Sequence, residues 1–369
     1  MKQLRIAYVI QEFGVGGAEK IVLDYLRLFE ARDDIAYIGI VLGKNNNSLY
    51  SKAAQTEGLN IVYLNCTPRR YKNAYLDLIR RRLTYNLKLY FTLKKFKPDV
   101  VHTHNTRMLK LITLCIKWCK KYRWFHTLHS DPYAVEEHNI ENAKSVFNDL
   151  GVFPVCLNNA QFEKAKARYG ISDCVIIRNI TDVKRFSDCT AKREDVRKEI
   201  GIDNSAYVIG TVGRLAEVKN YDFLIEVFAK VLPQKPNSVL LFAGDGDKDS
   251  LYNHAKALGI EDRVIFLGSR TDVERIYRAM DVFTLTSTSE ASSLVTVEAQ
   301  IAGLPCVISS AIPAESVCTK KVVIMPKDAS EQDWAAQLIS PSNFAKLQTT
   351  VEDYSVENNL SKLLKAYKK

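Results

Sequence analysis

Hydrophobic and polar positions alternate along this chain in a regular way, with short runs rich in β-branched residues separated by longer stretches of helical spacing. In the N-terminal half these apolar runs are nearly continuous, which is typical of parallel strands covered by helices on both faces. Helices are predicted between the strands, for example at 18–30 and 51–57. The strands predicted in this half are 6–9, 36–41, 61–63, 100–102, 124–128, 155–157 and 175–177.

The same alternation of short apolar strands and longer helical stretches begins again after a polar, charge-rich segment at 181–204. A length of 369 residues exceeds the usual size of one core, so we predict two α/β domains, each with a doubly wound parallel sheet of the Rossmann type. The predicted domains are 1–182 and 183–349, followed by a C-terminal helix within about 350–369. The strands predicted in the second half are 207–212, 239–243, 264–267, 282–285 and 306–308.

Composition narrows the class of protein. A hydrophobic content of 47% and a charged content of 25% are ordinary for a globular protein. The first apolar run, at 6–10, is too short for the apolar part of a signal peptide, and no stretch approaches the ~18 apolar residues of a membrane-spanning helix. We therefore predict a cytoplasmic protein. The eight cysteines form no C-x-x-C pair, which favours reduced thiols packed in the interior and argues against a zinc site.

The positive charge is concentrated in one segment. Residues 67–97 contain ten Lys or Arg against one acid, Asp77, and thus hold nine of the ten net positive charges. Apolar and aromatic residues lie between the charges, as in an amphipathic helix at a membrane interface. A solvated helix face explains the same pattern, so peripheral contact with an anionic membrane is one of two alternatives. No recognised nucleic-acid-binding motif accompanies the charge, and we expect no nucleic acid partner.

Glycines follow the first predicted strand and directly precede a helix, at Gly14, Gly16 and Gly17. They allow the backbone to approach a ligand, and the helix start offers free N–H groups to an anion, although any tight strand-to-helix turn favours glycine. Glu19 stands where the dinucleotide-binding pattern has its third glycine, and the second strand ends without an acid for a ribose. Both observations argue against a nicotinamide-dependent enzyme.

Two cations follow the first strand of the second domain. Arg214 can donate to two oxygens of a phosphate, and Lys219 adds a second positive charge within reach. A diphosphate leaving group gains negative charge as its bond to a sugar breaks, so two fixed cations would lower that barrier. Ligands bind beyond the carboxyl ends of parallel strands, and we therefore favour this role over that of two solvated loop residues.

The strongest local signal is a run of small polar residues at 287–293, which follows a strand and leads into an apolar helix. Glu290 lies at the entrance of this loop, where an N-cap-like role is the structural alternative to ligand binding. Glu298 lies further along, in an otherwise apolar helix. A ribose diol would supply donors to its carboxylate, as would a lysine in a salt bridge. The amide groups predicted to face a bound phosphate or sugar are those of Ala291, Ser292, Ser293 and Leu294.

Together these motifs resemble those of the retaining glycosyltransferases of family 4, which have the GT-B fold. The family marker is a Glu, seven residues, then Glu-Ala and a Gly-x-Pro turn, and it matches Glu290, Glu298 and 303–305. The resemblance spans nearly the whole chain. The sequence of the motif at 298–307 looks most like that of bacterial exopolysaccharide and capsule enzymes. The other matching motifs are Gly-Gly-Ala-Glu-Lys at 16–20, Asp-Val-Val-His-Thr-His at 99–104 and Val-Ile-Phe-Leu-Gly at 264–268.

The resemblance implies a donor-binding role for four residues of the second domain. Glu298 would bind the ribose hydroxyls, and Glu290 would contact hydroxyls of the donor sugar near the reacting carbon. Arg214 and Lys219 would hold the diphosphate.

Further implied contacts lie in loops. Gly16 and Gly17 would let the donor phosphate and the acceptor approach the N-terminal domain. The loop around Ser269 and Arg270 would meet the base, largely through its backbone. The final helix would return to the first domain, as it does in this fold.

Four histidines end two neighbouring predicted strands. His129 matches the family's Thr-x-His position, whose imidazole faces the hydroxyls of the donor sugar, so the resemblance implies a catalytic role for it. For His126 we favour a satisfied core side chain. For His102 and His104, substrate contact and a core role both stay open.

Two departures from the family pattern bear on geometry. Ala291 stands where the family often has glycine, which implies a sugar pocket of different shape. The interdomain Asn-Gly-x-Asp pattern appears as Asn-Ile-Thr-Asp at 179–182, which puts the hinge geometry in question more than the chemistry.

The sequence thus predicts a retaining glycosyltransferase that moves a sugar from a nucleotide diphosphate, with uridine favoured by family habit, to a hydroxyl of a glycan or lipid-linked glycan of the cell surface. No metal or other cofactor is expected, because the nearest Asp-x-Asp match, at 245–247, is explained by a turn. The alternatives are a nucleotide-sugar epimerase of the same architecture and a non-catalytic nucleotide-sugar-binding protein.

Overall fold

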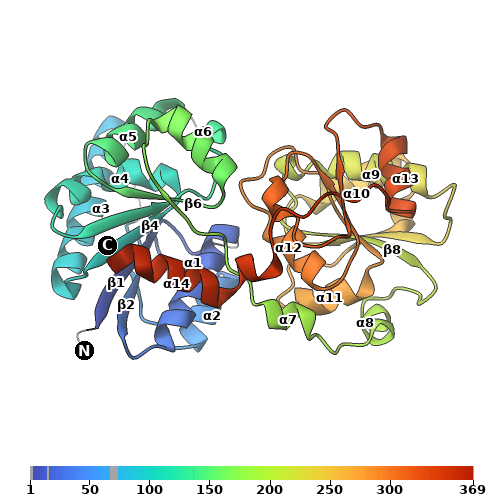
Figure 1. Ribbon diagram of the computed structural model, residues 1–369, viewed down its shortest axis with the longest axis horizontal. Helices are drawn as coiled ribbons and strands as arrows, with labels where there is room; N and C mark the ends of the chain where they lie inside the picture. The colour runs from blue at the N-terminus through green and yellow to red at the C-terminus, as the bar shows by residue number, and fades with distance from the viewer. Residues whose placement is uncertain (1–2, 15, 67–73, 136, 369) are drawn as a thin grey trace. The chain divides into compact units, whose positions relative to one another are not determined.

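The computed structural model describes residues 3–14, 16–66, 74–135 and 137–368. The chain divides into two compact units (Figure 1). The first comprises Met1–Ile180 together with Leu360–Lys369, and the second comprises Thr181–Asn359. Residues 67–73 of the predicted basic segment lie outside the described residues.

The first unit is built on a parallel sheet of seven strands in the order β3-β2-β1-β4-β5-β6-β7. Its strands are β1 (Leu4–Ile10), β2 (Ile35–Val41), β3 (Ile61–Tyr63), β4 (Val100–His104), β5 (Arg123–Thr127), β6 (Phe153–Cys156) and β7 (Val175–Ile176). The strand order reverses between β1 and β4, and ligands of such sheets bind beyond the carboxyl ends of the strands at that point. The helices are α1 (Gly17–Glu30), α2 (Leu49–Thr56), α3 (Ala74–Phe96), α4 (Thr106–Trp118), α5 (Glu137–Asn148), α6 (Asn159–Tyr169) and the main part of α14 (Val356–Lys368).

The second unit repeats this plan with six parallel strands in the order β10-β9-β8-β11-β12-β13. Its strands are β8 (Tyr207–Val212), β9 (Ser238–Ala243), β10 (Val264–Phe266), β11 (Val282–Leu285), β12 (Cys306–Ser309) and β13 (Val322–Met325). Here the order reverses between β8 and β11. The helices are α7 (Val183–Ser187), α8 (Arg193–Glu199), α9 (Tyr221–Val231), α10 (Lys248–Ala257), α11 (Val273–Ala279), α12 (Leu294–Ile301) and α13 (Glu331–Ile339).

The predicted fold class of two doubly wound α/β domains is confirmed. Every predicted strand is present. The central strands are buried, as all five residues of β4 are, whereas the short strands β3 and β7 at the two edges of the same sheet are only partly buried. The strand β13 was not predicted. It has four residues at the edge of its sheet and follows the two lysines at 320–321, so its pattern is short and interrupted by charge.

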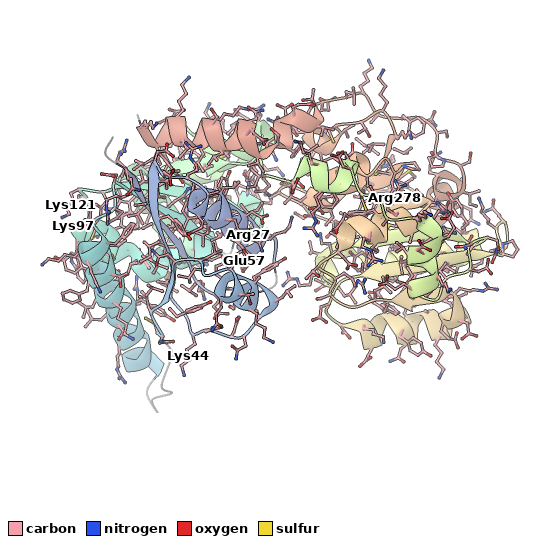
Figure 2. All side chains as sticks on the ribbon, turned by 90° about the horizontal axis from the view of Figure 1, so that it is seen from below. Arg27, Lys44, Glu57, Lys97, Lys121 and Arg278 are labelled. Carbon is pink, nitrogen blue, oxygen red and sulfur yellow. The ribbon has the colours of Figure 1, made fainter. Side chains whose placement is uncertain are left out.

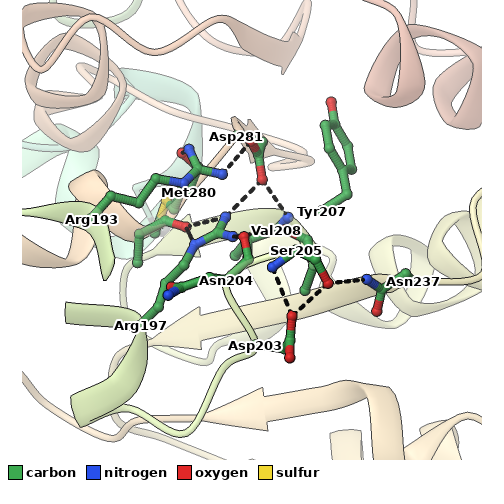
Figure 3. Close-up of polar contacts among 12 residues, drawn as sticks. Arg193, Arg197, Asp203, Asn204, Ser205, Tyr207, Val208, Asn237, Met280 and Asp281 are labelled. Atoms are coloured by element: carbon green, nitrogen blue, oxygen red, sulfur yellow. Dashed lines mark hydrogen bonds and ion pairs between the residues drawn. The ribbon is translucent and has the colours of Figure 1, made fainter. Parts of the chain in front are cut away.

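A buried arginine anchors α8 to the sheet of the second unit (Figure 3). Arg197 is fully buried, and its guanidinium donates to the carbonyl of Ala279 at 3.0 and 2.9 Å and to the carboxylate of Asp281 at 2.9 Å. The same carboxylate accepts from the amide of Val208 at 2.8 Å and from Arg193 at 2.5 Å. Because the buried charge is paired and its donors are used, it stabilises the packing of α8 on β8 and β11.

A surface ion pair joins α1 to the end of α2 in the first unit (Figure 2). Arg27 donates to Glu57 at 2.7 and 2.5 Å, and this hydrogen bonding holds the pKa of the Glu57 carboxyl below its usual value. All eight cysteines are free thiols, and six of them are buried. Within the described ranges, no helix has the combination of length and apolarity needed to cross a bilayer.

Candidate functional site

Two loops meet at the carboxyl ends of β8 and β11 in the second unit. The hydroxyl of Thr286 donates to the carbonyls of Lys219 at 2.9 Å and Asn220 at 3.0 Å. The amide of Thr288 donates to the carbonyl of Val218 at 2.9 Å. These bonds fix the loop after β11 to the loop after β8 at the switch point of the sheet, where the sequence placed its candidate phosphate and sugar ligands.

Lys219 and Glu290 form an ion pair inside this junction. The distance from Lys219 Nζ to Glu290 Oε1 is 2.5 Å, and the side chains are 17% and 14% exposed. Ser287 Oγ donates to the same carboxylate oxygen at 2.9 Å. The two residues come from loops 71 positions apart, and the structure brings them together as neighbours that can contact one ligand.

Glycines hold the loop after β8 in place. Gly213 has a φ of +146°, and a Cβ on it would lie 3.7 Å from Lys219 Cε, so the lysine stem lies directly above this glycine. A Cβ on Gly244 would lie 1.9 Å from the carbonyl oxygen of Gly213, and one on Gly246 would lie 2.2 Å from that of Leu215. The turn at 244–247 therefore packs backbone to backbone under the loop that presents the two cations.

The other predicted cation has a different environment. Arg214 is exposed, and it makes no ion pair or hydrogen bond with any other residue in the described parts of the chain. Its guanidinium is therefore available to oxygens of a ligand that reaches the Gly213 loop.

The start of α12 provides backbone donors. Ser293 is the N-cap, but its hydroxyl contacts Thr296 Oγ1 at 2.8 Å and does not accept from the first amides of the helix. Such amides, at the positive end of the helix dipole, bind anions and hydroxyl oxygens. The predicted residues Ala291, Ser292 and Leu294 are all partly exposed in this stretch.

Glu298 lies on α12 and is only 3% exposed. The hydroxyl of Tyr277 lies 3.4 Å from Glu298 Oε2 and 3.1 Å from the carbonyl oxygen of Val295. Burial and the Glu298 charge raise the pKa of Tyr277 well above its ordinary value, so Tyr277 stays a neutral donor.

The loop predicted to meet a nucleotide base begins at Gly268. Ser269 is exposed, whereas the guanidinium of Arg270 is bound to Asp272 at 2.8 and 2.7 Å and to Glu199 at 3.2 Å. The Arg270 side chain is thus held by carboxylates, and the contacts it leaves for a base are those of the backbone. The predicted contact itself stays a prediction.

In the first unit, the glycines after β1 begin α1. Gly16 is the N-cap, and a Cβ on it would lie 2.4 Å from a carboxylate oxygen of Glu19, so the Glu19 side chain folds back over this residue. A Cβ on Gly17 would meet open space. The predicted donor and acceptor contacts of these two glycines stay predictions.

Histidines gather at the carboxyl ends of β4 and β5. His126 is a satisfied core side chain, because its ring nitrogens contact Thr103 Oγ1 at 2.8 Å and Thr106 Oγ1 at 3.4 Å. His102 is likewise satisfied by Thr127 Oγ1 at 2.7 Å and by the hydroxyl of Tyr367.

Tyr367 extends this network into the C-terminal helix. It is fully buried, and its hydroxyl oxygen lies 3.1 Å from that of Tyr8 as well as contacting His102. This contact was not predicted from the sequence. The one feature of the sequence that could have indicated it is a tyrosine, which carries a polar hydroxyl, at an apolar position of the final helix.

His104 and His129 form a second pair. His104 Nδ1 lies 2.8 Å from His129 Nε2, and the His104 ring stacks on that of His102 at a centroid distance of 4.6 Å. Burial lowers the pKa of His129 to about 4, so at neutral pH both rings are uncharged and one nitrogen donates to the other. His129 is partly exposed at the strand end, whereas His104 is buried.

A small pocket opens beside these rings. Its lining includes Tyr25, His102, His104, Arg178 and Asn179. Among the described residues, the buried atoms Tyr25 Oη and His104 Nε2 have no hydrogen-bond partner. The pocket therefore has polar atoms that a bound hydroxyl or water can satisfy.

A metal ion would need several ligating side chains clustered at the site. Over the described ranges, no group of three or more His, Cys, Asp or Glu is arranged to hold an ion. The expectation of a metal-independent reaction stays a prediction.

Comparison with solved structures defines the class of fold. Anabaena HepE in complex with UDP-glucose superposes with a TM-score of 0.77 and 19% identity over 98% of this chain and 95% of that one. The lipopolysaccharide outer core galactosyltransferase WaaB gives 0.69 and 19% over 98% and 99%. This chain therefore has the GT-B fold.

Comparison with families and curated proteins is more specific. Residues 192–356 match the family model of glycosyl transferases group 1. UDP-Gal:alpha-D-GlcNAc-diphosphoundecaprenol alpha-1,3-galactosyltransferase of Escherichia coli is 30% identical over 237 residues, which are 61% of each chain. D-inositol 3-phosphate glycosyltransferase of Corynebacterium urealyticum is 27% identical over 73% of this chain and 71% of its own. The resemblance to glycosyltransferases is thus confirmed, and assignment to family 4 stays a prediction.

Proposed function

We propose that this protein is a retaining glycosyltransferase that transfers a hexose from a nucleotide diphosphate sugar to a hydroxyl of a glycan or lipid-linked glycan. The observation that supports it most is the junction of the β8 and β11 loops, which contains Lys219, Glu290 and the N-terminal end of α12, where the Ser293 side chain does not cap the helix. One cation, one carboxylate and a helix start are the groups that a diphosphate joined to a polyhydroxyl ring requires.

In this proposal the donor rearranges the ion pair. Diphosphate oxygens compete with Glu290 for Lys219 Nζ, and Glu290 is then available to accept from hydroxyls of the sugar. Arg214, which is exposed on the same loop after β8 as Lys219, binds the same diphosphate. Glu298 accepts from the ribose hydroxyls, and Tyr277 orients its carboxylate.

The reaction we propose proceeds within one bound complex. The bond from the anomeric carbon to the diphosphate oxygen breaks, and the cations stabilise the charge that develops on the leaving group. The acceptor hydroxyl attacks the same face of the sugar and passes its proton to the leaving phosphate. The products are the glycoside, with its anomeric configuration retained, and the nucleoside diphosphate.

One relative supports the proposed classes of donor and acceptor. The printed name of the Escherichia coli relative describes a UDP-sugar donor and a diphosphoundecaprenol-linked acceptor. We therefore propose a UDP-sugar as donor and a lipid-linked glycan of cell-surface polysaccharide synthesis as the first acceptor to try. The neutral His129 is proposed to contact the donor sugar.

The proposal is tested in two steps. A thermal-shift panel of UDP, GDP, ADP, CMP and NAD identifies the nucleotide, because stabilisation grows with ligand concentration over its dissociation constant. The matching nucleotide sugars are then incubated with and without lipid-linked acceptors, and NMR reports the anomeric configuration of the product. Isomerised donor formed without acceptor would indicate an epimerase, and binding without turnover on any acceptor would indicate a non-catalytic protein.

A further inference from the structure

We infer that the paired helices α3 and α4 form a docking surface for an anionic lipid membrane. This surface is distinct from the histidine cluster and from the loops of the second unit, and it is defined by the exposed residues Leu83, Leu87, Phe91, Leu114 and Trp118 with the lysines that border them.

Exposed apolar side chains are concentrated here. Of the twelve large hydrophobic residues that are exposed within the described ranges, five are the residues of this surface, and Phe91 is 61% and Trp118 45% exposed. Single exposed apolar residues are normal in soluble proteins, whereas contiguous groups mark interaction sites. The five exposed apolar side chains on two adjacent helices therefore indicate a surface that binds a partner.

The five residues form two adjacent rows. Leu83, Leu87 and Phe91 recur every four residues on α3, and Leu114 and Trp118 do so on α4, so each row follows one helix face. Tyr90 closes the space between the rows, with its ring centroid 6.0 Å from that of Trp118 and 5.3 Å from that of Phe91. Together Leu87, Tyr90, Phe91 and Trp118 line a shallow groove.

A buried amide locks the two helices in register. Asn86 is 1% exposed, donates to the carbonyl of Leu111 at 2.8 Å and accepts from the amide of Cys115 at 2.6 Å. The apolar rows are thus fixed side by side by a satisfied polar contact beneath them, so the surface is presented without rearrangement.

Positive charge surrounds the apolar rows. Sequence positions 78–130 contain one acid, Asp99, whose carboxylate accepts from the amide of Arg5 on β1. Lys97 and Lys121 lie near the same end of α3 (Figure 2). The exposed lysines of α3, α4 and the turn after α4 are Lys88, whose ammonium donates to the carbonyl of Leu64, and Lys94, Lys95, Lys117, Lys120 and Lys121.

This combination favours a membrane over another protein. Trp and Tyr rings prefer the boundary between headgroups and acyl chains, and lysines beside them contact anionic headgroups. Each lysine near an anionic surface strengthens binding severalfold. A second copy of this chain would place six like charges against six others, which disfavours self-association through this face.

The test is co-sedimentation of the full chain with vesicles, in the absence of nucleotide and acceptor. We expect binding to vesicles of phosphatidylcholine with about one third phosphatidylglycerol, weak binding to phosphatidylcholine alone, and release at high salt, because salt screens the attraction of lysines to anionic headgroups. The apolar variant is Phe91→Gln with Trp118→Gln, and the basic variant is Lys94→Gln with Lys95→Gln and Lys117→Gln. Each is expected to weaken binding, by about 100-fold for the three lysines.

Matched controls lie in the second unit. Phe344→Gln with Leu347→Gln removes two comparably exposed apolar side chains, and Lys198→Gln with Lys256→Gln and Lys320→Gln removes three exposed lysines. Both controls are expected to bind vesicles as the unchanged protein does, and all variants should keep its thermal unfolding midpoint.

Three results would overturn the inference. The first is equal binding to neutral and anionic vesicles, and the second is vesicle binding that is unchanged in both surface variants. The third is that the protein binds no vesicles but forms a dimer, and that this dimer dissociates in the Phe91→Gln, Trp118→Gln variant. Because nucleotide and acceptor are absent from the assay, its failure leaves the proposed transfer reaction untouched, and failure of the nucleotide panel leaves this inference untouched.

Discussion

Lys219 Nζ lies 2.5 Å from Glu290 Oε1, so a cation assigned to a phosphate and a carboxylate assigned to a sugar neutralise one another. The pair is held by Ser287 on the carboxylate and by Thr286 on the carbonyl of the lysine. A bound diphosphate can therefore replace Glu290 as the partner of Lys219. The Glu290 carboxylate does not remain unpaired after this exchange, because hydroxyls of the sugar donate to it.

Lys219→Ala should lower kcat/KM for the donor by about 10²- to 10³-fold, since it removes a fixed cation from the developing charge of the leaving group. Steady-state kinetics at saturating acceptor provide the measurement. Lys230→Ala, which removes an exposed lysine from α9, is the control and should have little effect. Near-normal turnover of the Lys219→Ala protein would remove this lysine from the site.

Glu298→Gln should raise the donor KM more than it lowers kcat. The substitution keeps the shape of the side chain but removes a charged acceptor for ribose hydroxyls, at a cost of about 1.5–3 kcal/mol or roughly 10- to 100-fold in affinity. Titration calorimetry with UDP and with uracil separates a ribose contact from a base contact. If UDP affinity is unchanged in the variant, Glu298 serves only the packing of α12 against Tyr277.

The first unit should lose stability as pH falls from about 6.5 towards 4. Burial lowers the pKa of His126 to about 3 and that of His129 to about 4 in the folded chain, whereas the unfolded chain binds protons near pH 6.5. In that window the unfolded state holds more protons, so acid favours it, by at most ~1.4 kcal/mol per pH unit for each histidine.

Urea unfolding at several pH values measures this slope. Trp118 and Trp124 report on the first unit, and Trp334→Phe removes the signal of the second. His126→Gln should reduce the slope between pH 6 and 5 by close to one proton. An unaltered slope in that variant would mean that His126 is protonated in the folded chain.

Arg197→Met should destabilise the second unit by about 3 kcal/mol, because it removes the buried partner of Asp281 and leaves the carbonyl of Ala279 without its donors. Arg193→Met is the matched control. It removes the other arginine on the same carboxylate, but that side chain is 36% exposed, and the expected loss is within ~1 kcal/mol. Urea unfolding followed through Trp334 makes the comparison, and equal losses would contradict a special role for burial.

The strands were predictable because each of them corresponds to a short run of apolar residues that can be recognised locally in the sequence. The same holds for the loop that precedes α12, whose small polar residues follow the apolar run of β11. The ion pair of Lys219 with Glu290 was not predictable, since its partners are 71 positions apart and meet only through the pairing of β8 with β11.

Tyr367 illustrates the same limit at greater range. Its contact with His102 joins positions 265 residues apart, and apolar spacing alone predicts a buried ring without saying what its hydroxyl meets. Sequence patterns thus locate strands and loops, whereas the partners of polar side chains depend on which elements the fold brings together.

Gly244 has a consequence for how this protein tolerates change. No room exists for a methyl group between this residue and the backbone that bears Arg214, so even alanine here must push that backbone aside. A substitution at position 244 would accordingly mimic a substitution of Arg214 or Lys219, because its Cβ would lie 3.5 Å from the backbone nitrogen of Arg214, and mutational surveys of the chain should find all three positions intolerant.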